Sequence, residues 1–571
     1  MVIKSYRDRI IIFVFLITLA SIFLIARLFY IQLVQSNKMR ELAVGEHTKT
    51  IQIESARGTI FDCNLKELAI SIEVDSIYAQ PTQIKNPYMS AIKLAKILQM
   101  SHKRIYAKLT SNSSFVWIKR KVSKNQSQKI RELNLKGIGF LNEYKRFYPK
   151  RHLAAHLIGF AGLDNKGLEG IELAYDRELR GEVSKLVVLR DGKGKTILCP
   201  KNNSPSTASN GNDIILTIDE VIQHHAELEL KDVCNKYQAK GGSIIIMNPK
   251  TGEILASAIQ PSYDPNLFNQ YPPHQFRNKI ITDVFEPGST FKIITAAALL
   301  KEELIEQDKI YFCPGHIERE NRIIHCYKSH GHLNFEDIIA QSCNVGIIQC
   351  VKRLSDRKFY SHILEFGLNE PTKIALHGEE KGLLPHPRDW SKLSKYTIAI
   401  GQGISITPLQ LISAVAAIAN NGVLMQPLII KTIKNPEGKI IKKFKPTPVK
   451  QVISPNLAKE ITTLLKKVVN DGTGELAQID GYEIAGKTGT AQKVEPQGGY
   501  SSTRFIASFI GYLPADDPEL IILVVVDEPK GTYWGGQVAT PTFKRIAKRI
   551  LSYLGILPNK KTNVSTHNLE M

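Results

Sequence analysis

The sequence predicts an α+β protein that is attached to a membrane by a single N-terminal helix. Two observations carry this prediction. A long apolar run, residues 10–26, lies close to the N-terminus, as a membrane-spanning helix requires. Strand-like segments at residues 242–259 and 521–526 lie on either side of a helical middle. That order favours helices packed on an antiparallel sheet.

The composition is that of a globular protein with several domains: 571 residues, 43% hydrophobic and 23% charged. A formal net charge of +21 raises the question of nucleic-acid binding. The sequence contains no zinc-finger spacing, no RNA-binding aromatic motif and no helix-turn-helix pattern, so we expect no nucleic-acid partner. A basic protein close to anionic lipid and anionic wall polymer is the simpler explanation.

The apolar run at residues 10–26 continues through residues 28–34 and is long enough to span a bilayer. A cleaved signal peptide is the alternative, but no small-x-small cleavage site ends the run. Basic residues before the run place the N-terminus in the cytoplasm by the positive-inside rule; these are Lys4, Arg7 and Arg9. We therefore expect residues 1–35 to form an uncleaved single-pass anchor, with the rest of the chain in the periplasm or its equivalent.

Between the anchor and residue 211, short strand-like runs alternate with polar helices, and no cluster suggests an active site. Residues 57–62 look like a strand that enters a turn, and a helix is expected from Gly167 to Leu179. The segment from Asn202 to Asp213 is rich in Asn, Ser, Pro and Gly, which marks a boundary between domains.

After this boundary, residues 221–233 are expected to be helical, followed by strands at 242–247 and 254–259. The turn residues 248–253 between these two strands make them a hairpin. Residues 521–526 form a fully apolar, β-branched run, the pattern of a central strand covered on both faces.

The stretch from Phe285 to Leu300 reads as a serine nucleophile at the start of a buried helix. A Pro-Gly turn precedes Ser289, and an apolar, alanine-rich run follows Lys292. Residues three positions apart lie on one helix face with Cβ atoms roughly 5–6 Å apart, so the lysine amine can reach the serine oxygen and act as its base. The spacing alone proves little, because Ser-x-x-Lys also begins at Ser90 and Ser355 in charged or polar surroundings.

Two further motifs follow in an informative order. The first lies after an expected helix at residues 335–340, and the second after an expected short strand at residues 482–485. Similar triplets at residues 123–125 and 250–252 lie in the N-terminal part and at a hairpin tip, where turn chemistry explains them. The two motifs are Ser342-Cys343-Asn344 and Lys487-Thr488-Gly489-Thr490.

With these motifs the chain resembles the penicillin-recognising serine enzymes, whose Ser-x-x-Lys, Ser-x-Asn and Lys-Thr-Gly motifs occur in this order. The likeness extends to class B penicillin-binding proteins and covers almost the whole chain. Segments similar to that class's transpeptidase domain and to its non-catalytic pedestal are Gly401-Gln402-Gly403, Thr407 to Gln410, Tyr533 with Gly535-Gly536, Arg57-Gly58, His156 to Gly159 and Gly167 to Gly170.

The resemblance implies a catalytic role for five residues. Ser289 attacks the carbonyl between the last two D-alanines of a stem peptide, and Lys292 takes its proton. Lys487 lies close by and lowers the pKa of Lys292 through its like charge. Ser342 relays the proton to the leaving amine, and Asn344 holds the substrate amide and the lysine.

The resemblance also implies how substrate is bound. Backbone N–H groups of Ser289 and Thr490 form the oxyanion hole. The terminal carboxylate is bound by Lys487, Thr488 and Thr490, and Gly489 belongs to the same substrate-binding motif. A second peptide's amine then resolves the acyl-enzyme to form a cross-link, and β-lactam antibiotics acylate the same serine.

The implied architecture is α+β with an anchor at 1–35, an elongated β-rich pedestal at 36–205, a transpeptidase domain at 206–555 with an antiparallel sheet and packed helices, and a polar tail at 556–571.

Two departures from the family pattern concern cysteines. Cys63 stands where the family continues with arginine, which affects a local turn. Cys343 occupies the middle of the second motif and adds a thiol near the site.

Within class B, residues 285–287 and 167–172 look more like the septal enzyme than the elongation enzyme. A septal role implies a membrane glycan polymerase and divisome proteins as partners, in the cell inner membrane with a periplasmic catalytic domain. We expect no cofactor and no metal. Four alternatives stay open: an elongation-type transpeptidase, a D,D-carboxypeptidase, a membrane-bound β-lactamase, and a non-enzymatic penicillin-binding receptor or scaffold.

The chain has seven cysteines, so at least one is unpaired within a monomer. Cys313 and Cys326 flank an expected hairpin-like loop, residues 317–324, that would bring the two sulfurs together. We favour a disulfide, since the expected compartment is oxidising. A zinc site that uses His316 and His325 and a pair of free thiols are the alternatives.

Overall fold

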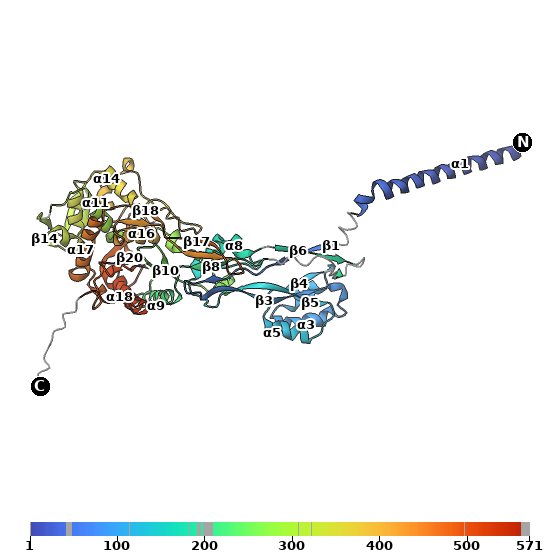
Figure 1. Cartoon of the computed structure of the whole chain (residues 1–571), viewed down its shortest axis with the longest axis horizontal. Coiled ribbons are helices and arrows are strands. Elements are labelled where there is room, and N and C mark those ends of the chain that lie inside the picture. Colours follow the sequence, from blue (N-terminus) through green and yellow to red (C-terminus); the bar gives the residue numbers. More distant parts are fainter. Residues whose placement is uncertain are drawn as a thin grey trace, which may run out of the picture. The chain divides into compact units, whose positions relative to one another are not determined.

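The computed structural model describes nine stretches of the chain: residues 2–40, 48–113, 115–181, 183–190, 196–197, 209–306, 308–320, 322–495 and 497–560. The chain divides into two compact units, and Figure 1 colours their elements by position in the sequence. The first unit comprises residues 1–55, 73–144 and 182–209, and the second comprises 56–72, 145–181 and 210–571.

The N-terminal helix α1 (Val2–Phe29) continues into a π-helical turn, η1 (Tyr30–Val34). Among the described residues, one helical segment is long and apolar enough to cross a membrane; it covers 29 residues, Tyr6–Val34, with a mean hydropathy of 2.7. At 1.5 Å per residue such a segment extends about 44 Å, more than the roughly 30 Å of a bilayer core. The single apolar helix expected from the sequence is confirmed.

The first unit contains paired strands with helices packed against them, and these strands belong to a seven-stranded sheet. Strand β3 (Glu67–Ala79) pairs there with β4 (Val116–Lys119) and β5 (Ile138–Phe147). Its core gathers Ile77, Leu94 and Ile105, all without exposed surface. The other elements of this unit are η2 (Pro81–Gln83), α3 (Pro87–Leu98), α4 (His102–Leu109), α5 (Lys124–Glu132), β1 (Thr48–Glu54), β6 (Val183–Arg190) and β7 (Thr196–Ile197).

A buried ion cluster joins two separated pieces of the second unit, residues 56–72 and 145–181. The carboxylate of Glu172, which has no exposed surface, lies 2.7 Å from Arg57 Nη2 and accepts a hydrogen bond from Arg146 Nε. Arg57 also pairs with Asp176 at 2.6 Å. Removing these charges from water is costly unless each is compensated, so residues 57, 146 and 172 must come together for this part of the chain to fold.

The centre of the second unit is a five-stranded sheet in the order β10-β9-β21-β20-β19, and every neighbouring pair is antiparallel. The expected central strand, 521–526, is the middle strand of this sheet, and the expected hairpin 242–259 forms its edge. Both predictions are confirmed. The strands are β9 (Gly241–Met247), β10 (Ile254–Gln260), β19 (Ala485–Val494), β20 (Tyr500–Leu513) and β21 (Leu520–Asp527).

Both faces of this sheet are buried, which explains why its strands are apolar throughout rather than alternating. Leu523 packs into one core and its neighbour Val524 into the other, because successive side chains point to opposite faces. One face is covered by α9 (Glu220–Lys236) and α18 (Gly535–Leu554), which lie side by side (Figure 1). The other is covered by α11 (Lys292–Lys301), α16 (Pro408–Ala419) and α17 (Pro455–Asp471).

The remaining elements are short. They are β2 (Ile60–Phe61), α6 (Ala155–Ile158), α7 (Gly170–Ala174), α8 (Asp176–Arg180), β8 (Asp213–Leu216), η3 (Pro265–Gln270), η4 (Pro273–Gln275), α10 (Lys279–Thr282), η5 (Gly288–Phe291), β11 (Tyr311–Cys313), β12 (His316–Arg319), β13 (Arg322–His325), β14 (Gly331–Leu333), α12 (Phe335–Ala340), α13 (Asn344–Val351), α14 (Asp356–Glu365), η6 (Pro387–Asp389), α15 (Ser394–Ala399), β15 (Val423–Met425), β16 (Ile430–Lys434), β17 (Ile440–Lys443), β18 (Pro448–Gln451) and η7 (Glu475–Ala477).

Two local expectations were wrong. The helix expected from Gly167 to Leu179 is two shorter helices, α7 and α8. The short strand expected at residues 482–485 is instead β19, which begins at Ala485 and contains the third motif itself. The expected domain boundary at residues 205/206 and the tail at 556–571 stay predictions, since residues 198–208 and 561–571 lie outside the described residues.

We expect Glu172→Gln to destabilise the second unit by about 3–5 kcal/mol, because it removes the ion-pair partner of buried Arg146 and leaves buried Arg57 with Asp176 alone. The measurement is the thermal unfolding midpoint of the full-length protein in detergent, which should fall.

The matched control is Glu336→Gln at the Lys467 pair, where the glutamate side chain is 54% exposed. It should change stability by less than about 1 kcal/mol. Equal midpoints for the two variants would show that the buried cluster does not stabilise the unit.

Candidate active site

Ser289 lies in the short turn η5, which leads directly into the buried helix α11. The preceding Gly288 has a φ of +56°, and its N–H donates to Gly401 O at 3.0 Å. A Cβ on Gly401 would lie 2.0 Å from Gly288 O, and one on Gly288 would lie 2.8 Å from Thr490 O. The turn that carries Ser289 is therefore held tightly between the loop at Gly401 and strand β19.

Gly489 of the third motif is also required by packing. A Cβ at this position would lie 2.3 Å from Ser508 Oγ and 2.8 Å from Thr290 Cγ2. Distances this short do not occur between real side chains, so only glycine lets β19 lie against the turn that contains Ser289 and Thr290.

Lys292 has no exposed surface and directs its amine at the second motif. Its Nζ donates to Ser342 O at 2.6 Å and to Asn344 Oδ1 at 2.7 Å, and lies 3.3 Å from Ser342 Oγ. Burial lowers the pKa of this amine to about 8, since removal from water disfavours the charged form. The first and second motifs therefore lie close together, as expected, and Lys292 makes the contact between them.

The second motif has an unusual backbone. Ser342 has a φ of +55°, a conformation that non-glycine residues adopt rarely and often at functional sites. The next residues start helix α13, with Cys343 as its N-cap. Asn344 is fixed from both sides, because its Oδ1 accepts from Lys292 and its Nδ2 donates to His325 O at 2.9 Å.

Lys487 of the third motif is also completely buried, on β19. Burial, together with the charge of Lys292, lowers the pKa of Lys487 well below its ordinary value. The two amines are thus close enough to interact, as expected. Burial is the main cause of the lowered pKa of Lys292, and the influence of Lys487 on that pKa stays a prediction.

The other two residues of the third motif bond to neighbouring elements. Thr488 Oγ1 lies 2.7 Å from Thr473 Oγ1, and Thr490 Oγ1 accepts from Gly535 N at 3.0 Å. Gly535 starts α18, so this helix positions the end of the motif.

The cysteines near the second motif differ from the sequence-based expectation. Strands β12 and β13 form the expected hairpin, yet Cys313 and Cys326 are free thiols with sulfurs 3.7 Å apart. The disulfide prediction was therefore wrong. The side chains gathered round these sulfurs are His330 and Cys343, in place of the histidines at 316 and 325.

Two family models match the chain. The Penicillin binding protein transpeptidase domain matches residues 242–548, more than half of the chain, and the Penicillin-binding Protein dimerisation domain matches residues 52–216. The chain belongs to the class B penicillin-binding proteins. Its triplets, at Ser289, Ser342 and Lys487, all lie inside the matched transpeptidase range.

Relatives place this class B penicillin-binding protein in the septal transpeptidase type. Stage V sporulation protein D of Bacillus subtilis is 38% identical over 94% of this chain and 84% of its own length. Probable peptidoglycan D,D-transpeptidase PenA of Neisseria meningitidis is 35% identical over 94% and 91%. Peptidoglycan D,D-transpeptidase FtsI of Escherichia coli is 30% identical over 96% and 92%.

Solved structures agree with the α+β architecture. A peptidoglycan synthetase from Bifidobacterium adolescentis superimposes with a TM-score of 0.72 at 26% identity, covering 90% of this chain and 98% of its own. Penicillin binding protein 3 from Mycobacterium tuberculosis, complexed with aztreonam, gives 0.70 at 26% identity, covering 89% and 98%.

We expect Gly401→Ala to slow acylation by a fluorescent penicillin at least about 100-fold, because a new Cβ must displace Gly288 and with it Ser289. The measurement is the second-order rate constant of labelling.

Gly438→Ala is the control. Gly438 also has a positive φ, +84°, but a Cβ there would meet no heavy atom of the described residues within 4 Å. This variant should lose only about 1–2 kcal/mol of stability from backbone strain and keep its labelling rate. If both variants label alike, the Gly401–Gly288 contact does not position the nucleophile.

Proposed function

We propose that this protein is a peptidoglycan D,D-transpeptidase that cross-links stem peptides through a serine acyl-enzyme on Ser289. Relatives at 30–35% identity are named peptidoglycan D,D-transpeptidases. One observation carries the assignment of the site: the buried amine of Lys292, one turn from Ser289, is bonded to both polar residues of the second motif. β-Lactams acylate the same serine, in keeping with the penicillin-binding family.

Lys292 is the base in this proposal. A neutral amine has two N–H donors and one lone pair, and Ser342 O and Asn344 Oδ1 at 2.6 and 2.7 Å accept both N–H groups. The lone pair is then free to take a proton from a hydroxyl. A pKa of about 8 leaves an appreciable neutral fraction near neutral pH, and this suits a general base.

Ser342 relays the proton to the leaving D-alanine amine, and its Oγ lies 3.3 Å from Lys292 Nζ. Asn344 orients the amine of Lys292 and the substrate amide. In acyl transfer the negative charge develops on the carbonyl oxygen, and backbone N–H groups of Ser289 and Thr490 stabilise it. Each such donor contributes about 3 kcal/mol to lowering the barrier.

Strand β19 supplies the carboxylate-binding part of the site. Lys487, Thr488 and Thr490 bind the terminal carboxylate of the stem peptide, with Gly489 between them holding the strand against η5. Lys487 is buried without an ion-pair partner among the described side chains. An incoming carboxylate therefore compensates a charge that burial otherwise disfavours.

The N-terminal segment makes this a single-pass membrane protein. We propose that it lies in the cell inner membrane with its N-terminus in the cytoplasm and its catalytic unit in the periplasm, in line with the basic residues that precede the apolar run. A septal role makes a membrane glycan polymerase and divisome proteins its partners.

Ser289→Ala should abolish covalent labelling by fluorescent penicillin while the protein keeps its melting temperature, because the change removes one small hydroxyl. Ser355→Ala is the matched control. Ser355 begins another Ser-x-x-Lys and caps α14, so its loss costs about 1 kcal/mol of stability and leaves labelling intact. Labelling that persists in Ser289→Ala would place the nucleophile elsewhere.

The same preparation separates the alternative activities. Wild-type protein is incubated with a stem peptide that ends in D-Ala-D-Ala, with and without an amine acceptor, and products are followed by mass spectrometry. Cross-linked dimer that requires the acceptor supports transpeptidation. Release of D-alanine alone indicates a carboxypeptidase. Rapid turnover of penicillin indicates a β-lactamase, and a stable penicillin adduct without peptide turnover indicates a receptor.

Lys487→Met should slow acylation by about 100-fold or more and weaken binding of carboxylate-bearing substrates, while methionine keeps most of the buried volume. Lys493→Met is the control on the same strand, since Lys493 pairs with Asp527 and Glu528 outside the motif. Acylation kinetics unchanged in Lys487→Met would remove this lysine from the mechanism.

A further inference from the structure

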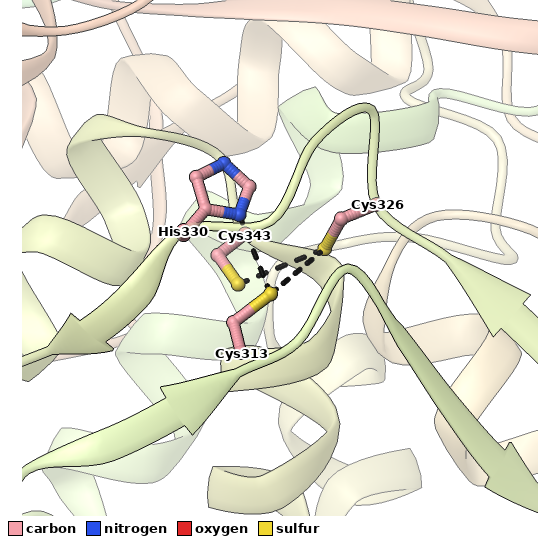
Figure 2. Close-up of side chains that lie close together, drawn as sticks. All are labelled: Cys313, Cys326, His330 and Cys343. Carbon is pink, nitrogen blue, oxygen red and sulfur yellow. Dashed lines mark hydrogen bonds between the residues drawn. The ribbon is translucent and has the colours of Figure 1, made fainter.

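Three cysteines and one histidine form a compact cluster beside the second motif (Figure 2). Cys313 ends β11, Cys326 follows β13, His330 precedes β14 and Cys343 caps α13. Their sulfur and nitrogen atoms all lie within 4.8 Å of one another. Figure 2 shows the four side chains pointing toward a common centre from separate elements.

Three distances within the cluster are close to those of a tetrahedral metal site, and the other ligand atoms lie within 4.8 Å of one another. Cys326 Sγ lies 3.7 Å from both Cys313 Sγ and Cys343 Sγ, and Cys313 Sγ lies 3.4 Å from His330 Nδ1. With bonds of about 2.3 Å to sulfur and 2.0–2.1 Å to nitrogen, tetrahedral zinc holds its ligands about 3.8 Å apart for two sulfurs and about 3.6 Å for sulfur and nitrogen. The three measured pairs already lie close to these separations.

Backbone N–H groups at the start of α13 point at two of the sulfurs. Asn344 N and Val345 N donate to Cys326 Sγ at 3.2 and 3.3 Å, and Gly346 N donates to Cys343 Sγ at 3.2 Å. Hydrogen bonds of this kind stabilise the charged thiolate, which is the form that binds metal. The positive end of the helix macrodipole acts in the same direction.

We propose that Cys313, Cys326, His330 and Cys343 bind one Zn²⁺ ion in a closed, structural site. Binding replaces three thiol protons, which are released to solvent, and the neutral imidazole donates a lone pair through Nδ1. The complex of Zn²⁺ with three thiolates has a net charge of −1. Four protein ligands fill a tetrahedral shell, so the ion has no open position and takes no part in the acyl transfer.

The role that follows is to hold the second motif. Cys343 lies between Ser342 and Asn344, and Cys326 accepts from the N–H of Asn344. The metal would thus tie the strands at residues 311–333 to the start of α13. Ser342 keeps its φ of +55°, and Asn344 stays against Lys292, only if that segment is fixed.

A disulfide explains the cluster less well. Cys326 is equally far, 3.7 Å, from two other sulfurs, so any one disulfide would leave a third sulfur and the imidazole beside it without a function. The sequence spacing Cys-x12-Cys-x3-His-x12-Cys supplies all four ligands from one segment.

The test starts with the full-length wild-type protein, purified in detergent without chelator. We expect about one zinc ion per chain by inductively coupled plasma mass spectrometry. After removal of the metal and addition of Co²⁺, we expect the visible absorption bands of tetrahedral cobalt with thiolate ligands, which need no catalytic activity to be observed.

The variants Cys313→Ser and His330→Gln should lose at least about tenfold in zinc affinity, with a lower melting temperature and slower penicillin labelling. Cys350→Ala is the matched control, since Cys350 is a buried thiol on the same helix as Cys343 but outside the cluster. It should keep its zinc.

The site fails if wild-type protein carries no zinc and non-reduced mass spectrometry shows either alkylated cysteines or a disulfide among residues 313, 326 and 343. It also fails if the Cys313→Ser variant and the wild type carry equal zinc. Ser289→Ala separates this proposal from the proposed function, because it should lose penicillin labelling and retain zinc. If wild-type protein binds zinc but is never labelled by penicillin, the metal site is supported and the proposed enzymatic function is contradicted.

Discussion

The burial of Lys292 is the constraint on which the rest of the active site depends. A lysine without exposed surface cannot stay charged cheaply, so its amine must be neutral for much of the time or find acceptors inside the protein. Two neutral oxygens, Ser342 O and Asn344 Oδ1, fill this need at 2.6 and 2.7 Å. To offer its carbonyl, Ser342 takes a left-handed backbone conformation, which the start of α13 must then hold in place.

The five-stranded sheet is the second element that holds the candidate site in place. β19 carries the third motif and is paired along its length with β20, while both faces of the sheet are buried under helices. Buried strands are among the least mobile parts of a protein. Lys487 on β19 and Lys292 on α11 are therefore held by elements that pack into the same unit.

Local sequence patterns made part of the fold and of the candidate site predictable. The apolar run 521–526 identified the middle strand, and the order of three short motifs predicted the candidate site. Other features depend on contacts between residues far apart in the chain. The ion cluster at Glu172 and the conformation of Ser342 have no local signal. In the zinc alternative, the sequence predicted His316 and His325 as partners of Cys313 and Cys326 because these histidines belong to the same hairpin, whereas the fold brings His330 and Cys343 to the sulfurs. The spacing Cys-x12-Cys-x3-His-x12-Cys was present in the sequence.

The packing around Gly489 bears on how resistance to β-lactams can arise. A side chain at this position would collide with Thr290 and Ser508 and move the turn that carries Ser289, the proposed nucleophile. Under the proposed function, that movement would impair acylation by the drug and by the natural stem peptide alike. We therefore expect that substitutions which lower sensitivity to β-lactams occur at positions other than Gly489.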